Sequence, residues 1–181
     1  MEMFGEWIEI IFALAVMTGI VISLVAWSIK NGISPMPTSF KAKSALLALL
    51  PSDLQGKIYE LGSGWGTLML PLARHYPRNM IIGFETSPLP YGFSLIWLKI
   101  IPLKNVKIMR QDFFSADLKE ASLVVCYLYP GAMKKLKDKF QKELKPGTFV
   151  ISNTFSITGW KVERLIEVGD LYHSKIYLYK I

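Results

Sequence analysis

The sequence has little cysteine and little histidine, and both shortages restrict the chemistry open to the chain. Its single cysteine, Cys126, cannot form a disulfide within the chain, and a metal site built from several thiolates is excluded. A chain without internal disulfides fits a reducing compartment. The two histidines, His75 and His173, have no partner that the sequence pattern identifies. We therefore interpret both histidines as structural or surface residues and expect no metal.

Charge is absent from one long stretch near the N-terminus, the twenty residues from Ile10 to Ile29. A helix of this length, at about 1.5 Å per residue, would be roughly 30 Å long, which is the thickness of a bilayer's hydrocarbon core. Trp7 and Trp27 lie near its two ends, where interfacial aromatic residues are expected. The stretch predicts a single transmembrane helix, and we assign residues 1–30 to this anchor.

Two other structures would also explain an apolar stretch of this kind. A cleaved signal peptide favours a basic N-terminal region and a shorter apolar run. This chain instead begins with three acidic residues, Glu2, Glu6 and Glu9. A buried core helix is the second alternative, and we disfavour an amphipathic surface helix because the stretch is apolar all round and contains Gly19.

The distribution of charge predicts how the anchor is oriented. No Lys or Arg precedes the apolar stretch, whereas Lys30, Lys41 and Lys43 follow it. Because positive charge stays on the cytoplasmic side, the N-terminus of such an anchor is expected outside and the domain that follows it in the cytoplasm. Removing the three N-terminal acids from the net charge of +7 leaves +10 on the remainder, which favours contact with anionic lipid head groups. The lysine-rich stretch 134–145 is typical of a solvated helix face, and no motif favours a nucleic acid partner.

After the anchor, the pattern alternates between apolar runs typical of strands and longer helical segments. Residues 31–51 form a Pro-rich linker and a leading helix with Phe40, Leu46, Leu47 and Leu50 as its buried stripe, and residues 52–181 form one α/β domain. The alternation predicts a Rossmann-like sheet of seven strands, mostly parallel, closed by a C-terminal antiparallel hairpin. We expect strands over 57–61, 80–85, 105–111, 122–128, 148–154, 161–168 and 175–180, and helices over 40–50, 67–76, 87–101 and 130–144.

A glycine-rich loop follows the first predicted strand and precedes the first predicted helix of the domain. Its sequence is Glu60-Leu61-Gly62-Ser63-Gly64-Trp65-Gly66. Glycine allows positive φ and a close approach of the backbone to a ligand. The Gly-x-Gly-x-Gly spacing lacks the third glycine position of dinucleotide-binding loops, and the loop has no Walker lysine. A plain strand-to-helix turn would need neither three glycines nor the preceding acid, so we predict a cofactor-binding loop that includes Glu60, Gly62, Ser63, Gly64 and Gly66.

Two further acids follow the next two predicted strands. Glu85 ends the second strand about twenty residues beyond the loop, where an acid accepts hydrogen bonds from both ribose hydroxyls of an adenosine-containing ligand. An ordinary exposed carboxylate is the alternative. Asp112 and Phe113 follow the third strand, and Asp is also a common turn residue.

These residues together resemble the membrane-anchored class I protein-lysine methyltransferases, the family of the mitochondrial ATP-synthase c-subunit lysine methyltransferase and its prokaryotic relatives. The resemblance covers nearly the whole chain, from the apolar stretch and Pro35-Met36-Pro37-Thr38-Ser39 to the closing hairpin. It implies an S-adenosylmethionine-dependent methyltransferase domain over residues 52–181, with Glu60 facing the cofactor's methionine end. It also implies that Asp112 contacts the adenine amino group and that Phe113 packs on the ring.

The resemblance is not complete at the loop. The family often has Asp-Leu-Gly-Ser-Gly-Asp-Gly, whereas this chain has Glu60 in the first position and Trp65 in place of the second acid. Trp65 removes a charge next to the cofactor, so contacts at that position do not carry over from the family.

The fourth predicted strand ends in Cys126-Tyr127-Leu128-Tyr129-Pro130, and the resemblance implies that this segment lines the methyl-transfer site. It is not the Asn-Pro-Pro-Tyr or Asp-Pro-Pro-Tyr motif of many base and glutamine methyltransferases. Tyr127 and Tyr129 offer ring faces or hydroxyls to an amine or a sulfonium, although core packing would explain at least one of them. We interpret Cys126 as a buried strand residue. The resemblance implies a lysine acceptor in a membrane-associated protein, and a lipid or small-molecule acceptor or a non-catalytic cofactor-binding module are the alternatives.

Overall fold

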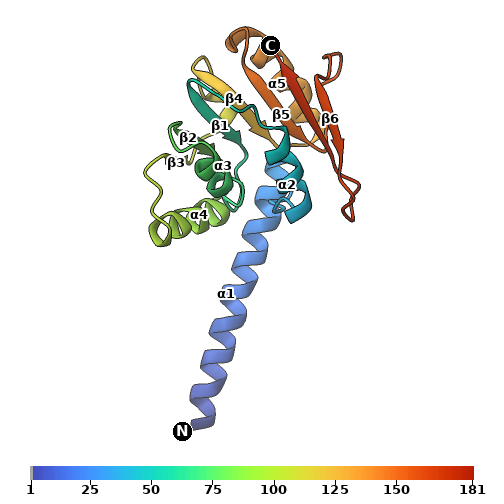
Figure 1. Ribbon diagram of the computed structural model, residues 1–181. Coiled ribbons are helices and arrows are strands. Elements are labelled where there is room, and N and C mark those ends of the chain that lie inside the picture. The colour runs from blue at the N-terminus through green and yellow to red at the C-terminus, as the bar shows by residue number, and fades with distance from the viewer. Residues whose placement is uncertain (1) are drawn as a thin grey trace. The chain divides into compact units, whose positions relative to one another are not determined.

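The computed structural model describes residues 2–181, so Met1, the first residue of the predicted anchor, lies outside the described residues. The chain divides into two compact units, Met1–Pro35 and Met36–Ile181. The first unit holds helix α1, and the second holds the sheet and the other helices (Figure 1). The boundary between the units falls within the predicted linker.

The first unit is formed by α1, which runs from Glu2 to Asn31. Within it, Glu6–Asn31 is long and apolar enough to cross a membrane, and most of its large apolar side chains are exposed. The hydroxyls of Thr18 and Ser28 each donate to the carbonyl four residues earlier, so both are satisfied within the helix. Length and composition therefore agree with the predicted anchor, while its insertion into a membrane stays a prediction.

The second unit begins with α2, Phe40–Leu49, whose first turn is capped by the Ser39 hydroxyl. The predicted buried stripe of this helix was partly wrong. The buried residues are Ala42, Leu46 and Leu49, which share one face because they are spaced four and three residues apart. Phe40 points away from that face and is 84% exposed, and Leu47 and Leu50 are only half-buried.

The predicted seven-stranded sheet with a C-terminal antiparallel pair is confirmed, and its strand order is β3-β2-β1-β4-β5-β7-β6. The first five strands are parallel, and β7 pairs antiparallel with both β5 and β6. The strands are β1 Lys57–Leu61, β2 Ile81–Phe84, β3 Val106–Met109, β4 Ala121–Cys126, β5 Phe149–Asn153, β6 Arg164–Glu167 and β7 Lys175–Lys180.

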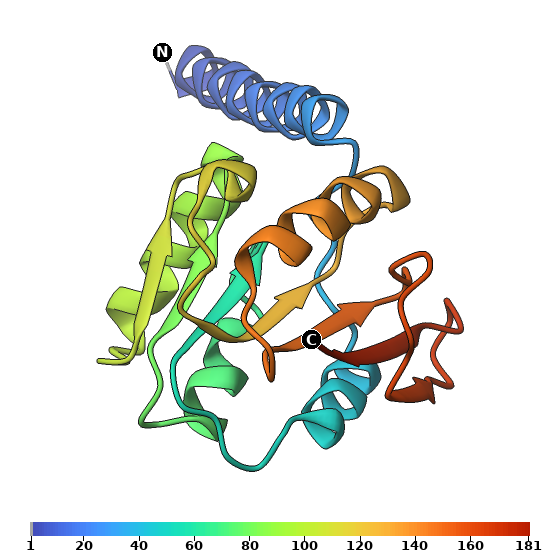
Figure 2. The same cartoon turned by 90° about the horizontal axis from the view of Figure 1, so that it is seen from above.

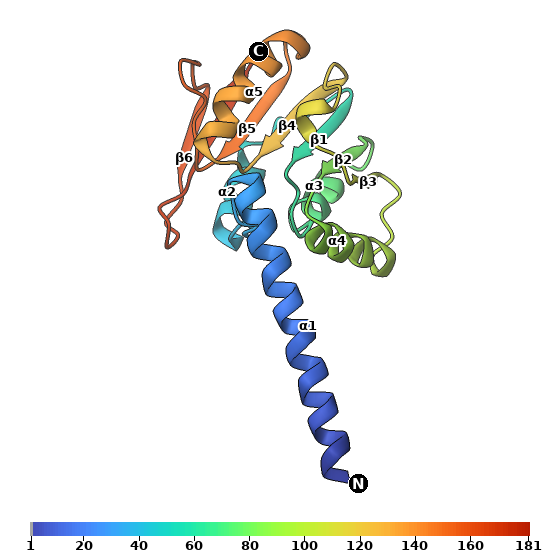
Figure 3. The same ribbon diagram turned by 180° about the vertical axis from the view of Figure 1, so that it is seen from behind.

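Helices cover both faces of this sheet, as Figures 2 and 3 show. On one face, α2, α3 (Met69–His75) and α4 (Pro88–Ile100) pack over alternate strand residues such as Ile58. On the other face, α5 (Pro130–Glu143) packs over the intervening residues such as Tyr59. The alternation continues along β4, whose side chains from Leu123 to Cys126 point to the two cores in turn.

The strand order places a topological switch point between β1 and β4. From β1 the chain runs outward to β2 and β3, whereas β4 and β5 extend the sheet on the other side of β1. In open parallel sheets, ligands bind at the carboxyl ends of the strands at such a point. The loops that follow β1, β2 and β4 meet there, and they contain most of the predicted site residues.

Candidate functional site

The glycine loop after β1 has the backbone conformation that its glycines predict. Gly62, Gly64 and Gly66 all have positive φ, at 72°, 53° and 71°. The Gly66 amide donates to the Ser63 carbonyl at 2.9 Å, which closes a tight turn. The Ser63 amide donates to the Phe84 carbonyl, also at 2.9 Å, so the loop is fastened to the end of β2.

The three glycines face different surroundings. A Cβ at Gly62 would lie 3.0 Å from Leu128, and one at Gly66 would lie 2.8 Å from the Ser94 hydroxyl. A Cβ at Gly64 would meet no atom within 4 Å. Packing therefore restricts two of the glycines, whereas Gly64 presents bare backbone to open space, where a ligand can approach.

Glu85, the predicted ribose-binding acid, lies directly against this loop. The Gly64 amide donates to one carboxylate oxygen of Glu85 at 2.8 Å, and the Ser87 amide donates to the other at 2.7 Å. The residue is 7% exposed, so the alternative of an ordinary exposed carboxylate is wrong. A carboxylate oxygen can accept two hydrogen bonds, so each oxygen of Glu85 can also accept one from a ribose hydroxyl.

Glu60, at the end of β1, is the most unusual polar group of the site. It is 6% exposed, and its Oε2 atom has no hydrogen-bond partner within the described residues. Burial and, to a lesser extent, the nearby Glu85 together raise the pKa of Glu60 to about 8, and Lys43 on α2 opposes the shift. A buried carboxyl without a partner is costly unless a ligand completes it, and a cationic group would do so.

Asp112 and Phe113 lie in the short turn after β3. The exposed Asp112 carboxylate accepts from the Phe114 amide at 2.9 Å and caps the 3-10 helix Phe113–Ser115, which is the turn role that its residue type allowed. Phe113 is half-buried, with its ring centroid 4.6 Å from that of Phe114. Contact of these two residues with adenine stays a prediction.

The segment after β4 shows different environments for its two tyrosines. Tyr129 packs against the α5 core, and its ring lies 2.6 Å from the position that a Cβ on Gly131 would take. Tyr127 is half-buried. Cys126 is buried in β4, and burial raises the pKa of its thiol to about 12, as suits a strand residue that takes no part in catalysis. Both tyrosines are half-buried, and contact of either with the acceptor stays a prediction.

One residue of the site was missed by sequence reasoning. The Ser94 hydroxyl on α4 donates to the Gly64 carbonyl at 3.0 Å, and the residue is 1% exposed. Its only signal in the sequence is that it is the one hydroxyl-bearing residue between Gly92 and Trp97, in an otherwise apolar helix. Ser94 fixes the loop from the side of α4.

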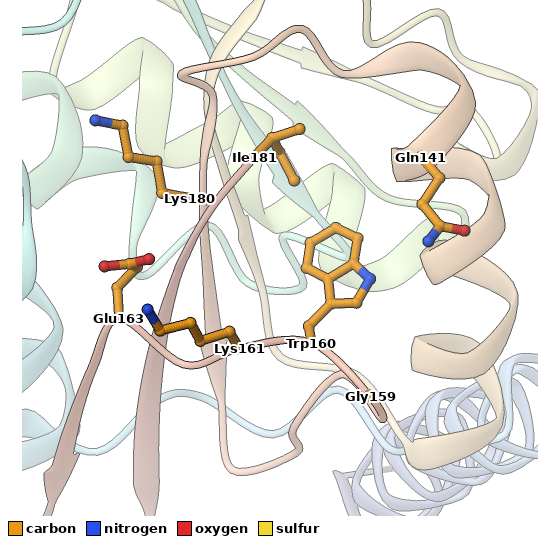
Figure 4. Close-up of a pocket in the computed structure, with 7 residues that line it drawn as sticks. All are labelled: Gln141, Gly159, Trp160, Lys161, Glu163, Lys180 and Ile181. Carbon is orange, nitrogen blue, oxygen red and sulfur yellow. The ribbon is translucent and has the colours of Figure 1, made fainter.

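A pocket elsewhere in the second unit plays no part in this site. Gln141, Trp160, Lys161 and Lys180 are among the residues that line it (Figure 4). Lys180 pairs with Phe149, the first residue of β5, so the pocket lies toward the amino ends of the parallel strands. Within the described residues, no three His, Cys, Asp or Glu side chains form a group that could hold a metal ion.

The arrangement has the features expected of an S-adenosylmethionine site. The loop offers bare backbone at Gly64, Glu85 offers acceptors for two ribose hydroxyls, and the orphaned oxygen of Glu60 suits the cofactor's α-amino cation. Together with the 3-2-1-4-5-7-6 sheet, these features define a class I S-adenosylmethionine-dependent methyltransferase.

Comparison with known proteins gives the family. The family model described as the ANTKMT methyltransferase domain matches residues 60–164, and the chain belongs to this family. A protein-lysine N-methyltransferase of Saccharolobus islandicus is 30% identical over 149 residues, which cover 81% of this chain and 92% of that protein. The adenine nucleotide translocase lysine N-methyltransferase of Mus musculus is 28% identical over 116 residues, 63% of this chain and 50% of the mouse protein.

Solved structures agree on the fold and the cofactor. An RNA methyltransferase from Salinibacter ruber, in complex with S-adenosyl-L-homocysteine, superposes with a TM-score of 0.72 at 29% identity and covers 81% of this chain and 94% of that one. A precorrin-6y C5,15-methyltransferase from Geobacter metallireducens GS-15 superposes with a TM-score of 0.63 at 17% identity, covering 80% and 89% of the two chains, and shows the fold alone. The predicted enzyme class and cofactor are thus confirmed.

Proposed function

We propose that this chain transfers a methyl group from S-adenosylmethionine to the amine of a lysine side chain in a membrane-associated protein. The similarity to the archaeal lysine methyltransferase over 81% of the chain is the main support. The mouse relative also has a lysine acceptor in its name. The absence of the Asn-Pro-Pro-Tyr or Asp-Pro-Pro-Tyr motif after β4 argues in the same direction, because that motif serves nucleobase and glutamine amino groups.

In this proposal the predicted site residues hold the cofactor along the carboxyl ends of three strands. Glu60 receives the α-amino group, and the loop from Gly62 to Gly66 lies under the methionine and ribose portions. Glu85 accepts from the ribose hydroxyls while it keeps the Gly64 amide in place. Asp112 and Phe113 would hold the adenine, in continuation of the turn that Asp112 already caps.

The chain's own residues mainly position and desolvate the acceptor. S-adenosylmethionine, when bound, supplies a methyl group that is already activated for displacement. The protein must then hold an amine in line with that methyl and exclude water. The lysine must approach as the free amine, and a partly desolvated site favours that form by lowering its pKa. Tyr127 and Tyr129 flank the approach, and we assign them contact with the acceptor rather than proton abstraction.

We also propose that α1 anchors the chain in a membrane once, with the second unit on the cytoplasmic side. The 26-residue apolar stretch and the lysines that follow it support this orientation. An enzyme held at the membrane meets membrane proteins at high local concentration, which agrees with an acceptor in such a protein.

Incubation of the full chain with membranes and methyl-labelled cofactor tests the acceptor. The products are separated into protein, lipid and RNA fractions, and the labelled protein is hydrolysed to amino acids. We expect label in protein and recovery of methyl-lysine. Label confined to lipid would replace the proposal with a lipid methyltransferase, and label confined to RNA would match the activity named for the Salinibacter protein.

A further inference from the structure

Helix α4 exposes far more apolar surface than its packing in the sheet domain explains. Phe93, Leu95, Ile96, Trp97 and Ile100 are all exposed, at up to 66% for Ile100, and together they form what we call the α4 surface. The helix already buries Pro90 and Ser94 toward the domain. An ordinary surface helix would be polar on the side that faces away from its core.

Four of these side chains form a continuous stripe, and Leu95 lies on another side of the helix. Phe93, Ile96, Trp97 and Ile100 are spaced three and four residues apart and therefore share one side of the helix. The Phe93 and Trp97 rings lie in edge contact, with centroids 6.1 Å apart. Contiguous exposed apolar patches of this kind mark interaction sites, because leaving them in water costs about 25 cal/mol per Å².

The segment that contains the α4 surface has charges of one sign only. Residues 86–111 contain no Asp or Glu, and their four cations are Lys99, Lys104, Lys107 and Arg110. Lys99 and Lys104, in the last turn of α4 and just after it, are both exposed. An apolar stripe with two aromatic rings and a rim of cations is complementary to an anionic bilayer surface, where rings take the head-group level and lysines meet lipid phosphates.

We propose that the α4 surface is a second membrane contact of this protein, separate from α1, and that it lies in the interfacial layer of an anionic bilayer. The apolar stretch of α1 would bring the same chain to a membrane. A symmetric contact with a second copy is disfavoured, because it would bring together two copies of a segment that contains cations and no acid.

This contact would place the methyl-transfer site next to the lipid surface. Ser94, on α4, bonds the Gly64 carbonyl, and the Phe93 ring contacts the Trp65 ring of the glycine loop with centroids 5.4 Å apart. This hydrogen bond and this ring contact thus hold α4 against the cofactor loop. The proposed α4 contact with lipid does not depend on which acceptor the enzyme methylates.

A spin label on the full chain reports whether α4 enters the bilayer. The native Cys126 is 1% exposed with its thiol pKa raised to about 12, so a nitroxide reagent labels an introduced cysteine selectively. The test variant is Ile96→Cys, and the matched control is Gln141→Cys, an exposed position on α5. Both are reconstituted in phosphatidylcholine vesicles with and without phosphatidylglycerol, and flotation first establishes that the chain is on the vesicles.

We expect the Ile96 label to collide several-fold more with oxygen than with a water-soluble nickel complex in anionic vesicles, while the Gln141 label remains in water. Lys99→Glu with Lys104→Glu should return the Ile96 label toward water. Reversal of Lys134 and Lys145, exposed lysines on α5 and just after it, changes the net charge equally and should leave the label immersed.

Two results would overturn the inference. An Ile96 label that reads as aqueous as the Gln141 label, on chains that float with the vesicles, would remove the α4 contact while leaving the anchor intact. Dipolar broadening between Ile96 labels that persists in detergent would assign the surface to a second copy. Methyl transfer measured on the same samples separates either result from a failure of the proposed enzymatic function.

Discussion

At the scale of single residues, Gly64 and Glu60 are most closely tied to cofactor binding. Gly64 combines a positive φ with open space at its Cα, whereas Gly62 and Gly66 are also constrained by packing. Glu60 has a buried oxygen without a hydrogen-bond partner in the described part of the chain. For each of these two residues, a role in cofactor binding predicts a result that a purely structural role does not predict.

Replacing Gly64 with leucine should abolish binding of S-adenosylhomocysteine, measured by calorimetry, while the protein stays folded. The side chain would occupy the open space before the loop, and the positive φ would cost about 1–2 kcal/mol of stability. Gly147→Leu is a matched control, because Gly147 also has positive φ and open space but lies in the turn before β5. Equal thermal destabilisation with binding lost only in Gly64→Leu is the expected result. Intact binding in Gly64→Leu would show that the loop is not the cofactor site.

The raised pKa of Glu60 predicts that cofactor affinity depends on pH. The carboxyl must lose its proton to pair with the α-amino cation, so the Kd for S-adenosylhomocysteine should fall as pH rises toward 8, by close to tenfold per unit well below the pKa. Glu60→Gln should bind more weakly at pH 8 and show no such slope. A slope that survives the substitution would assign the titration to another group.

The same shift predicts the stability of the free protein. Because the pKa of Glu60 is near 8 when folded and near 4.5 when unfolded, the folded state holds this proton more tightly. The free energy of unfolding should therefore fall between pH 4.5 and pH 8, by on the order of a few kcal/mol, and change no further from this group above pH 8. Denaturant titrations should show a flatter profile for Glu60→Gln than for the unaltered protein.

At the scale of elements, α4 both packs on the sheet and fixes the cofactor loop. Ser94→Ala removes the hydrogen bond to the Gly64 carbonyl, so we expect a stability loss of about 1 kcal/mol and a several-fold rise in the Kd for S-adenosylhomocysteine. Ser122→Ala is the control, because the Ser122 hydroxyl donates to the Lys57 carbonyl at the far end of β1. Similar changes in Kd for both variants, seen by calorimetry, would deny Ser94 a role in shaping the loop.

Several elements follow directly from the sequence, and others do not. The bounds of β1 and β7 agree with the predicted ranges, and Gly56 and Gly62 flank β1 on its two sides. Helix α3 starts two residues later than predicted, since the backbone from Gly66 to Leu68 completes the loop's turn first. Strand β6 ends at Glu167, which pairs with Lys175, the first residue of β7, and it begins at Arg164, three residues later than predicted.

The site was predictable to the extent that strand ends carry its residues. Glu60, the glycines and Glu85 could be placed together because parallel strands end at one edge of the sheet. Ser94 could not, because its bond to the Gly64 carbonyl depends on how α4 packs, which no local pattern encodes. The exposure of Phe40 had the same origin, since a helix's buried face is set by its tertiary partners.

At the scale of the whole molecule, the sheet, the loop and the family define a methyltransferase. Helix α1 and the α4 surface are the two features on which its proposed location at a membrane rests. Strand β7 lies between β5 and β6, so the last strand of the chain completes the interior of the sheet and β6 becomes its edge. The alternating pattern predicted an antiparallel closing pair but not this strand order. The order depends on the pairing of β7 with β5, which is distant in the sequence and which no local pattern encodes.

Mass spectrometry of membrane proteins from matched cells tests whether this chain methylates a lysine in a membrane protein. The cells contain this chain, lack it, or contain Gly64→Leu in its place. We expect a methylated lysine that is present only in cells with the unaltered chain. Lysine methylation that is identical in all three kinds of cell would contradict this expectation.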